Sequence, residues 1–244
     1  MSGDRATRKV RHWAEVSRLG RLHHVEAATP NAPAWVVVVC VTLVFSLGGW
    51  LSGSGDPSGA VVLLVFWVLV AGIGLWFMGS EKLLVLDHGI VVGSFAPFMR
   101  PTVVPWSGLD PRTVAAVVGN QRTIGLLLAD RGVSGSSRTV LWSRHPVTFM
   151  AVSPQVARHA WAQGQAVDLA TAPGFDLWVF STRRPSRQAP LVHALAAAMR
   201  DAQVPGADAV VPHALPPRRL RSTVEDADHL GIPVRMRRAP LRRS

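Results

Sequence analysis

Two long apolar runs near the N-terminus dominate the pattern of hydrophobic and polar positions along the chain. The runs at 34–52 and 59–80 contain no charged residue, and only residues 53–58 separate them. Each run matches the about 20 residues that an α-helix needs to cross a hydrocarbon core of about 30 Å. Because lipid offers no partner to backbone polar groups, the pattern predicts two transmembrane helices joined by a tight turn.

The residues that flank these runs predict their orientation. The segment before the first run is rich in arginine, whereas the turn between the runs carries one acid and no base. Under the positive-inside rule both termini lie in the cytoplasm, so we expect a multi-pass protein of the inner (cytoplasmic) cell membrane. Trp35, Trp50 and Trp76 stand near the ends of the runs and are predicted to be membrane-interface anchors. Trp67 lies in mid-run, where it either faces lipid or packs between the helices.

Beyond residue 80 the pattern changes to short β-type runs separated by turn signals. Ser153 and Pro154 are typical of an N-cap followed by proline at the first helical position, which predicts a helix through about residue 163. Apolar residues that recur on one face predict an amphipathic helix over about 187–203. Such a series is typical of an antiparallel barrel or sandwich. The strands are expected at 83–87, 90–93, 102–106, 113–118, 123–129, 139–142, 147–152 and 176–180.

Two stretches in this series carry a resemblance to a known family. LDHGI (Leu86 to Ile90) splits a strand pair, and VVPWSGLD (Val103 to Asp110) precedes a meander and a closing helix. With these features, residues 81–204 resemble the bacterial pleckstrin-homology-like (PH-like) domains, which often follow two membrane spans. The resemblance implies a mainly-β barrel or sandwich with a C-terminal capping helix and with Trp106 packed inside. It implies no fixed catalytic residue.

Together these patterns divide the chain into four parts. We expect a basic cytoplasmic N-terminal arm at 1–32, a two-helix transmembrane hairpin at 33–80, the PH-like β domain at 81–204 and a disordered basic tail at 205–244. The tail is predicted to be disordered because prolines recur in it and large apolar residues are few.

The charge of the chain changes this picture little. The net charge of +11 is spread over every part expected in the cytoplasm, and arginine far outnumbers lysine, as is typical of GC-rich, actinobacterial genomes. The basicity is therefore weak evidence for a nucleic-acid partner. No aromatic residue is interleaved with the arginines of the tail, so we expect no specific nucleic-acid recognition.

Candidate chemistry is sparse. The chain has no HExxH motif, nucleophile elbow or phosphate loop, so we expect no enzyme and no cofactor. Cys40 is the single cysteine, and the adjacent His23 and His24 are poorly placed to share a metal ion, so no metal site is expected. Basic side chains remain as candidates for contact with an anion, a lipid headgroup or a partner, with a solvated loop as the alternative: Arg183, Arg184 and Arg187 before the last helix, and Arg100 in the loop at 94–102.

The sequence therefore favours a non-enzymatic, membrane-anchored adaptor or scaffold that presents a PH-like domain to a protein partner. Its expected partners are the lipid bilayer and a protein, and it can form oligomers. One alternative is a membrane subunit of a transport or envelope-assembly complex, in which the hairpin itself packs against other helices. Another is a sensor of anionic lipid headgroups that acts through the arginines at 183–187.

Overall fold

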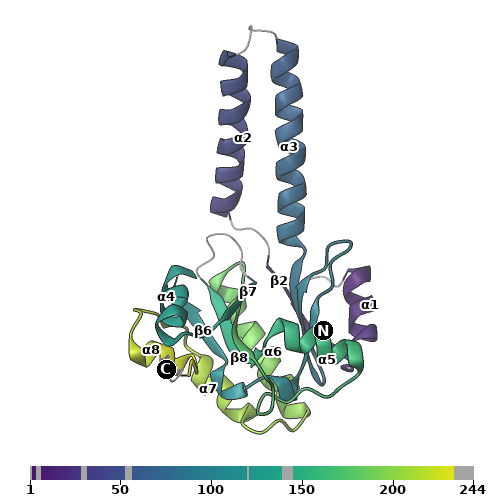
Figure 1. Cartoon of the computed structure of the whole chain (residues 1–244), viewed down its shortest axis with the longest axis vertical. Coiled ribbons are helices and arrows are strands. Elements are labelled where there is room, and N and C mark those ends of the chain that lie inside the picture. Colours follow the sequence, from purple (N-terminus) through teal and green to yellow (C-terminus); the bar gives the residue numbers. More distant parts are fainter. Residues whose placement is uncertain are drawn as a thin grey trace, which may run out of the picture.

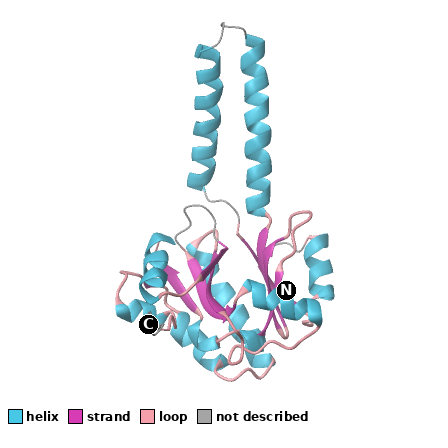
Figure 2. Ribbon diagram, viewed as in Figure 1, coloured by secondary structure: helices cyan, strands magenta, loops and turns pink. Residues whose placement is uncertain are grey.

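The computed structural model describes residues 2–3, 7–28, 32–52, 57–119, 121–138 and 145–233. Two helices, α2 (Ala32–Ser52) and α3 (Pro57–Gly79), lie side by side and project from a body that contains every other element (Figure 1). The body holds two five-stranded sheets that face one another, with helices between them and on their outer faces (Figure 2).

The first sheet has the strand order β1-β2-β3-β4-β5. Its strands are β1 (Ser2–Gly3), β2 (Leu22–Ala27), β3 (Glu81–Leu86), β4 (Gly89–Ser94) and β5 (Thr102–Pro105). All neighbouring strands are antiparallel except β1 and β2. Helix α1 (Arg8–Val16) covers the outer face, where Val10 and Trp13 pack with Leu84, Val91 and Phe95. The predicted strand pair around LDHGI is therefore confirmed.

The second sheet has the order β10-β6-β8-β9-β7 and mixes parallel with antiparallel pairs. Its strands are β6 (Ala115–Val118), β7 (Gly135–Arg138), β8 (Pro146–Val152), β9 (Phe175–Ser181) and β10 (Arg218–Arg219). Helix α4 (Gln121–Arg131) connects β6 to β7, and β7 pairs in parallel with β9. Strands β6 and β7 run in the same direction, with β8 and β9 between them, so a tight turn cannot join them and α4 forms the crossover.

The main core lies between the two sheets. Phe149 and Trp178 stack there with a ring-centroid distance of 6.2 Å, and Leu83 and Val85 of the first sheet belong to the same cluster. The remaining helices are α5 (Pro154–Gln163), α6 (Gln188–Asp201), α7 (Val210–Ala214) and α8 (Val224–His229), with 3-10 turns at Trp106–Gly108, Pro111–Thr113, Pro185–Arg187 and Ala207–Ala209. Helix α6 contributes its apolar face to this core, as its sequence pattern predicts.

The predicted transmembrane hairpin requires correction. Within the described residues, no helix is long and apolar enough to cross a membrane. The predictions of a transmembrane hairpin and of a multi-pass membrane localisation are therefore not upheld. In the helix pair, Trp67 stacks on Phe45 with a centroid distance of 4.9 Å, so it packs between α2 and α3.

The predicted PH-like barrel is also wrong. The chain forms an α/β fold with two separate sheets instead of one antiparallel barrel capped by a helix. The segment predicted as a strand at 123–129 is helix α4, because its apolar Ile124, Leu127 and Leu128 follow helical spacing and pack against the second sheet. The strand predicted at 139–142 lies outside the described residues.

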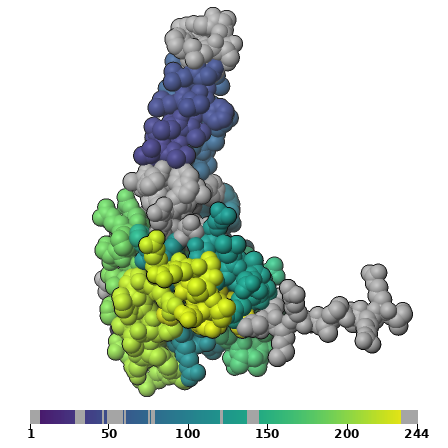
Figure 3. Space-filling model, turned by 90° about the vertical axis from the view of Figure 1, so that its left-hand side faces the viewer, coloured from purple at the N-terminus to yellow at the C-terminus, as the bar shows by residue number. Residues whose placement is uncertain are grey.

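The C-terminal segment is folded where a disordered tail is predicted. Residues 205–233 run over the body, and Figure 3 shows this segment, in yellow-green and yellow, forming much of one face. Leu220, Ala227 and Leu230 are buried on the outer face of the second sheet beside α4. Residues 234–244, the rest of the predicted tail, lie outside the described part.

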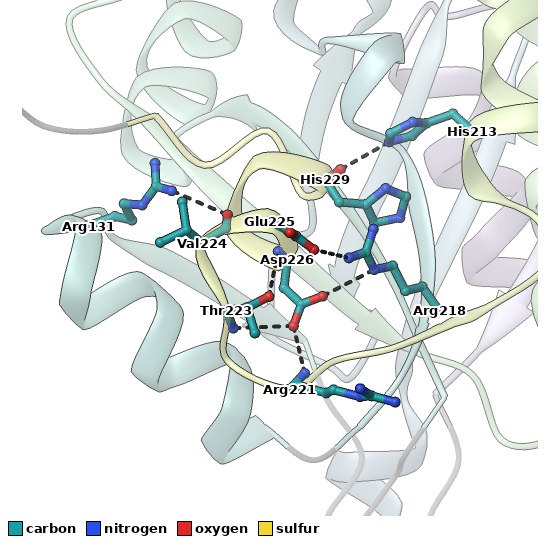
Figure 4. A network of polar contacts seen from close by, with 9 residues as sticks. All are labelled: Arg131, His213, Arg218, Arg221, Thr223, Val224, Glu225, Asp226 and His229. Atoms are coloured by element: carbon teal, nitrogen blue, oxygen red, sulfur yellow. Dashed lines mark hydrogen bonds and ion pairs between the residues drawn. The ribbon is translucent and has the colours of Figure 1, made fainter.

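A polar network fixes this segment (Figure 4). The buried Asp226 carboxylate accepts hydrogen bonds from the backbone N–H of Arg221 at 2.6 Å and from Arg218 Nε at 3.1 Å. Thr223 and Asp226 form a capping box at the start of α8. Arg131 of α4 donates to the Ile232 carbonyl oxygen at 3.3 Å and to the Asp228 carboxylate at 2.9 Å. Backbone-directed bonds therefore anchor a segment that buries few large side chains.

Candidate functional site

A groove of about 720 Å³ lies between β5 and α5. A volume of several hundred Å³ is typical of ligand-binding sites. We call this hollow the β5–α5 groove. Its lining consists of Val16, Ser17, Arg18 and Leu19 before β2, Val103, Pro105 and Ser107 along and after β5, Ala157, Trp161 and Ala162 of α5, and Gly164, Gln165, Ala166 and Val167 after it.

The Asp87 carboxylate positions the wall formed by residues 16–19. Oδ2 of Asp87 accepts a hydrogen bond from the backbone N–H of Arg21 at 2.6 Å, and Oδ1 lies 2.5 Å from Nε2 of His23. The backbone N–H of His88 donates to the Leu19 carbonyl oxygen at 2.9 Å. The hydrogen bond from Arg21, followed by that with His23, lowers the pKa of Asp87. The β3–β4 turn therefore holds this wall through a charged carboxylate.

Helix α5 forms the opposite wall, and its ends match its sequence signals. Oγ of Ser153 accepts a hydrogen bond from the backbone N–H of Val156, and Pro154 occupies the first turn. Gly164 ends the helix with a φ of 64°, which a glycine adopts without strain. The ring centroids of Trp161 and of Trp13 in α1 lie 5.8 Å apart, and Trp161 is 37% exposed. The wall thus offers a partly open aromatic surface.

The floor of the groove is strand β5 and the residues that follow it. The β5 strand ends the first sheet, so one edge of β5 faces away from β4. After the strand, Ser107 ties down the segment that follows α5: its hydroxyl donates to the Val167 carbonyl oxygen, and its own carbonyl oxygen accepts from the N–H of Leu169 at 2.9 Å. These bonds fix the width of the groove at this end.

The polarity of the lining limits what the groove can bind. Among the described lining residues, Arg18 carries the single charge, and its side chain is exposed. Its φ of 56° lies in the left-handed region, which a non-glycine residue adopts at a cost. Val16 is a further large apolar side chain that stays 39% exposed at the groove. The lining mixes polar and apolar groups around one positive charge, which suits a ligand with an acidic group.

The residues predicted as site candidates do not line this groove. Arg183, Arg184 and Arg187 lie between β9 and α6, as expected, where Arg183 and Arg184 are exposed and Arg187 is half-buried. Arg100 is exposed in the β4–β5 loop of the first sheet, whereas the other three arginines follow β9 of the second sheet. Whether any of these four arginines contacts a ligand stays a prediction.

The predicted interface tryptophans lie in the helix pair. Trp35, near the start of α2, is 49% exposed, and Trp76, near the end of α3, is 53% exposed. The start of α2 and the end of α3 lie at the end of the pair that adjoins the body (Figure 1). The side chain of Trp50 lies outside the described set. An anchoring role at a membrane interface requires the transmembrane hairpin, which the structure does not support, so we do not retain it.

Sequence reasoning missed a buried pair of ionisable residues in β2. Nε2 of His24 lies 3.3 Å from Oε2 of Glu26, and both side chains are almost fully buried. His23, its neighbour in sequence, faces Asp87 instead, because successive residues of a strand point to opposite faces. The alternation in the segment LHHVEA was the available signal, but it lies within the predicted basic arm. Within the described chain, no three His, Cys, Asp or Glu side chains are grouped to hold a metal ion.

Comparisons with protein-family models, with curated proteins and with solved structures found no match for this chain. The function therefore has to be argued from the groove itself.

Proposed function

We propose that this chain is a non-enzymatic adaptor whose body docks a protein partner in the β5–α5 groove. The observation that supports the proposal is the groove's lining: a hollow of about 720 Å³ in which Val16 and Trp161 stay partly exposed and Arg18 carries the one charge among the described lining residues. Large apolar side chains that stay open in an otherwise packed body favour a binding surface. Surface grooves are a recurring place where proteins hold peptides.

The test fills the groove. Octapeptides are selected from a random display library on the full chain, and their affinities are measured by fluorescence polarisation. Ala162 is exposed and lines the groove, so A162W is expected to weaken the selected peptides by at least tenfold. Ala129 is exposed on α4, away from the groove, so A129W is the matched control and should leave affinity unchanged. Failure to select any peptide, or binding that survives A162W, would contradict the proposal.

A second candidate function rests on the helix pair. Val44 of α2 is 66% exposed and Val62 of α3 is 68% exposed, and many apolar neighbours are similarly open. This surface favours a subunit of a larger transport or envelope-assembly complex that packs against α2 and α3. Replacing both valines with serine should then shrink the native complex isolated from cells, whereas A162W should not. The adaptor proposal predicts the reverse result.

A further inference from the structure

A pair of histidines joins helix α8 to helix α7. The imidazole rings of His213 in α7 and His229 at the end of α8 lie with their centroids 4.4 Å apart (Figure 4). Nε2 of His213 donates a hydrogen bond to the His229 carbonyl oxygen at 3.0 Å. Both residues are half-buried. This contact therefore fixes the end of α8, and with it residues 218–232, which we call the α8 segment.

The surroundings of the pair oppose its protonation. Burial, followed by the charges of His213 and Arg218, lowers the pKa of His229, whereas the charge of Asp226 acts in the other direction. The Asp226 carboxylate is itself bound to Arg218 Nε and to the backbone N–H of Arg221. Two imidazolium rings at this separation would repel each other, and partial burial would strengthen the repulsion.

The other charges near the pair are either paired or exposed. Glu225 lies 3.8 Å from Arg218, and Asp228 lies 2.9 Å from the buried Arg131 of α4. The acids of α8 are thus engaged with arginines before the histidines take up protons. The remaining charged side chains on the elements that pack against α7 and α8 are exposed: Arg112 and Asp208 of the 3-10 turns, His193, Arg200 and Asp201 of α6, and Arg122 and Asp130 of α4.

The α8 segment covers an apolar face of the body with little buried surface of its own. Its Leu220, Leu230 and Ile232 are buried in the same cluster as Val117 and Val179 of the second sheet. The bonds around Asp226 and those from Arg131 complete its attachment. A segment with few buried apolar contacts opens at a lower free energy than the core, so a modest repulsion can shift its attachment.

From this geometry we propose that His213 and His229 form a pH-sensitive latch: below about pH 6.5, protonation of the pair loosens the α8 segment and uncovers the outer face of the second sheet. The sign follows from linkage. A detached segment returns His229 to its ordinary pKa, so the detached form binds the proton more tightly and acid favours it. The latch lies on the second sheet and does not rest on the docking function proposed for the groove.

Amide hydrogen exchange of the full chain at about pH 8 and about pH 5, corrected for the intrinsic pH dependence of exchange, tests the latch. Protection over 218–232 should fall by roughly threefold to fivefold at the lower pH, the range of a partly exposed charge pair, while β8 and β9 keep theirs. In H229Q, which cannot take up the proton, protection should stay level. H159Q removes an exposed histidine on α5 and should keep the native pH dependence.

Equal protection of the native α8 segment at both pH values, or a native-like loss in H229Q, would overturn the latch. A second measurement needs no variant. The uncharged dye Nile red fluoresces on apolar surface, so its signal with the native chain should rise as the pH falls, with a midpoint below about 6.5. The proton NMR signal of the His229 ring should titrate over the same range. A dye signal that stays flat while this ring titrates would overturn the release of the segment.

Discussion

The backbone N–H of Arg21 donates a 2.6 Å hydrogen bond to the carboxylate of Asp87, 66 residues further along the chain. This bond joins the start of β2 to the β3–β4 turn, and it holds in place the residues that line one side of the β5–α5 groove. Trp106, which the sequence predicts to be packed inside, is buried and donates from Nε1 to the Asp87 carbonyl oxygen at 2.8 Å. Asp87 is therefore a junction between the turn, the groove wall and the core.

The lowered pKa of Asp87 predicts how stability depends on pH. A carboxyl group with a folded-state pKa below its unfolded value of about 3.9 stabilises the fold above that value. This stabilisation is lost as the pH falls through the folded-state pKa. D87N should thus melt at a lower temperature than the native chain at pH 7, and the difference should shrink toward pH 2. Thermal unfolding across this pH range measures it, with D208N at an exposed position as the control. A constant difference at all pH values would contradict the role of the charge.

The turn also depends on Gly89, for a reason that the sequence does not show. A tight reversal suggests a positive φ at this glycine, but its φ is not in that region. A Cβ at this position would instead press on the Val104 carbonyl oxygen and lie 2.8 Å from Cα of Pro105. G89A should therefore destabilise the body by roughly 2 kcal/mol or more, because backbone atoms of β5 would have to move.

Gly125 provides the matched control in the same chain. It is exposed in helix α4, and a Cβ there would meet nothing within 4 Å. G125A should raise the free energy of unfolding by up to about 1 kcal/mol, since alanine favours a helix over glycine. Denaturant unfolding of both variants gives the comparison, and equal effects at the two positions would argue against the close approach of β4 and β5.

The buried carboxylate of Asp226 should decide whether the C-terminal segment stays attached. Burial raises the pKa of Asp226, but hydrogen bonds from the backbone of Arg221 and Thr223 and the charge of Arg218 outweigh it, so the pKa is lowered. D226A removes these bonds to a charged carboxylate, at a cost of about 1–3 kcal/mol. Amide hydrogen exchange should become much faster over 218–232. E225A, next in sequence but largely exposed, should change stability by less than about 0.5 kcal/mol.

Phe98 stands out at the tip of the β4–β5 loop because it is fully exposed in a left-handed conformation with a φ of 69°. This conformation costs roughly 1–2 kcal/mol for most residues, but asparagine tolerates it. F98N should therefore stabilise the body by about 0.5–1 kcal/mol in denaturant unfolding. Met99 is half-exposed and has an ordinary φ, so M99N should have almost no effect. Destabilisation by F98N would mean that the phenyl ring makes a contact that stabilises the loop.

Local sequence signals predicted elements whose partners are close in the chain. The β3–β4 pair, the capped helix α5 and the amphipathic helix α6 all follow from such signals. Strand β2 was missed because its pairing with β3 bridges more than 50 residues, and its polar His24 and Glu26 hide a buried strand. The C-terminal segment was missed because a few apolar residues and backbone-directed bonds hold it in place, and neither gives a periodic pattern.

In the candidate site too, the sequence predicts local elements but not the long-range contacts between them. Strand β5 and helix α5 were both predicted, yet the groove between them was not, because its third wall comes from residues 16–19 within the predicted arm. Asp87 was read as part of a turn, which it is, but its bond to Arg21 is a long-range contact that no local pattern encodes. The isolated arginines drew attention because charge is visible in a sequence, whereas a hollow becomes visible only in three dimensions.

The helix pair α2 and α3 connects two strands that are direct neighbours in the first sheet. Strands β2 and β3 are antiparallel neighbours, and the N–H of Ala28 donates to the Glu81 carbonyl oxygen at 2.9 Å just where the two strands part. In the topology of the sheet, α2 and α3 therefore take the place of a hairpin turn. Lengthening a loop costs little free energy once its ends are fixed. The length and the surface of α2 and α3 can therefore vary in evolution, while the register of the sheet and the groove beside β5 stay as they are.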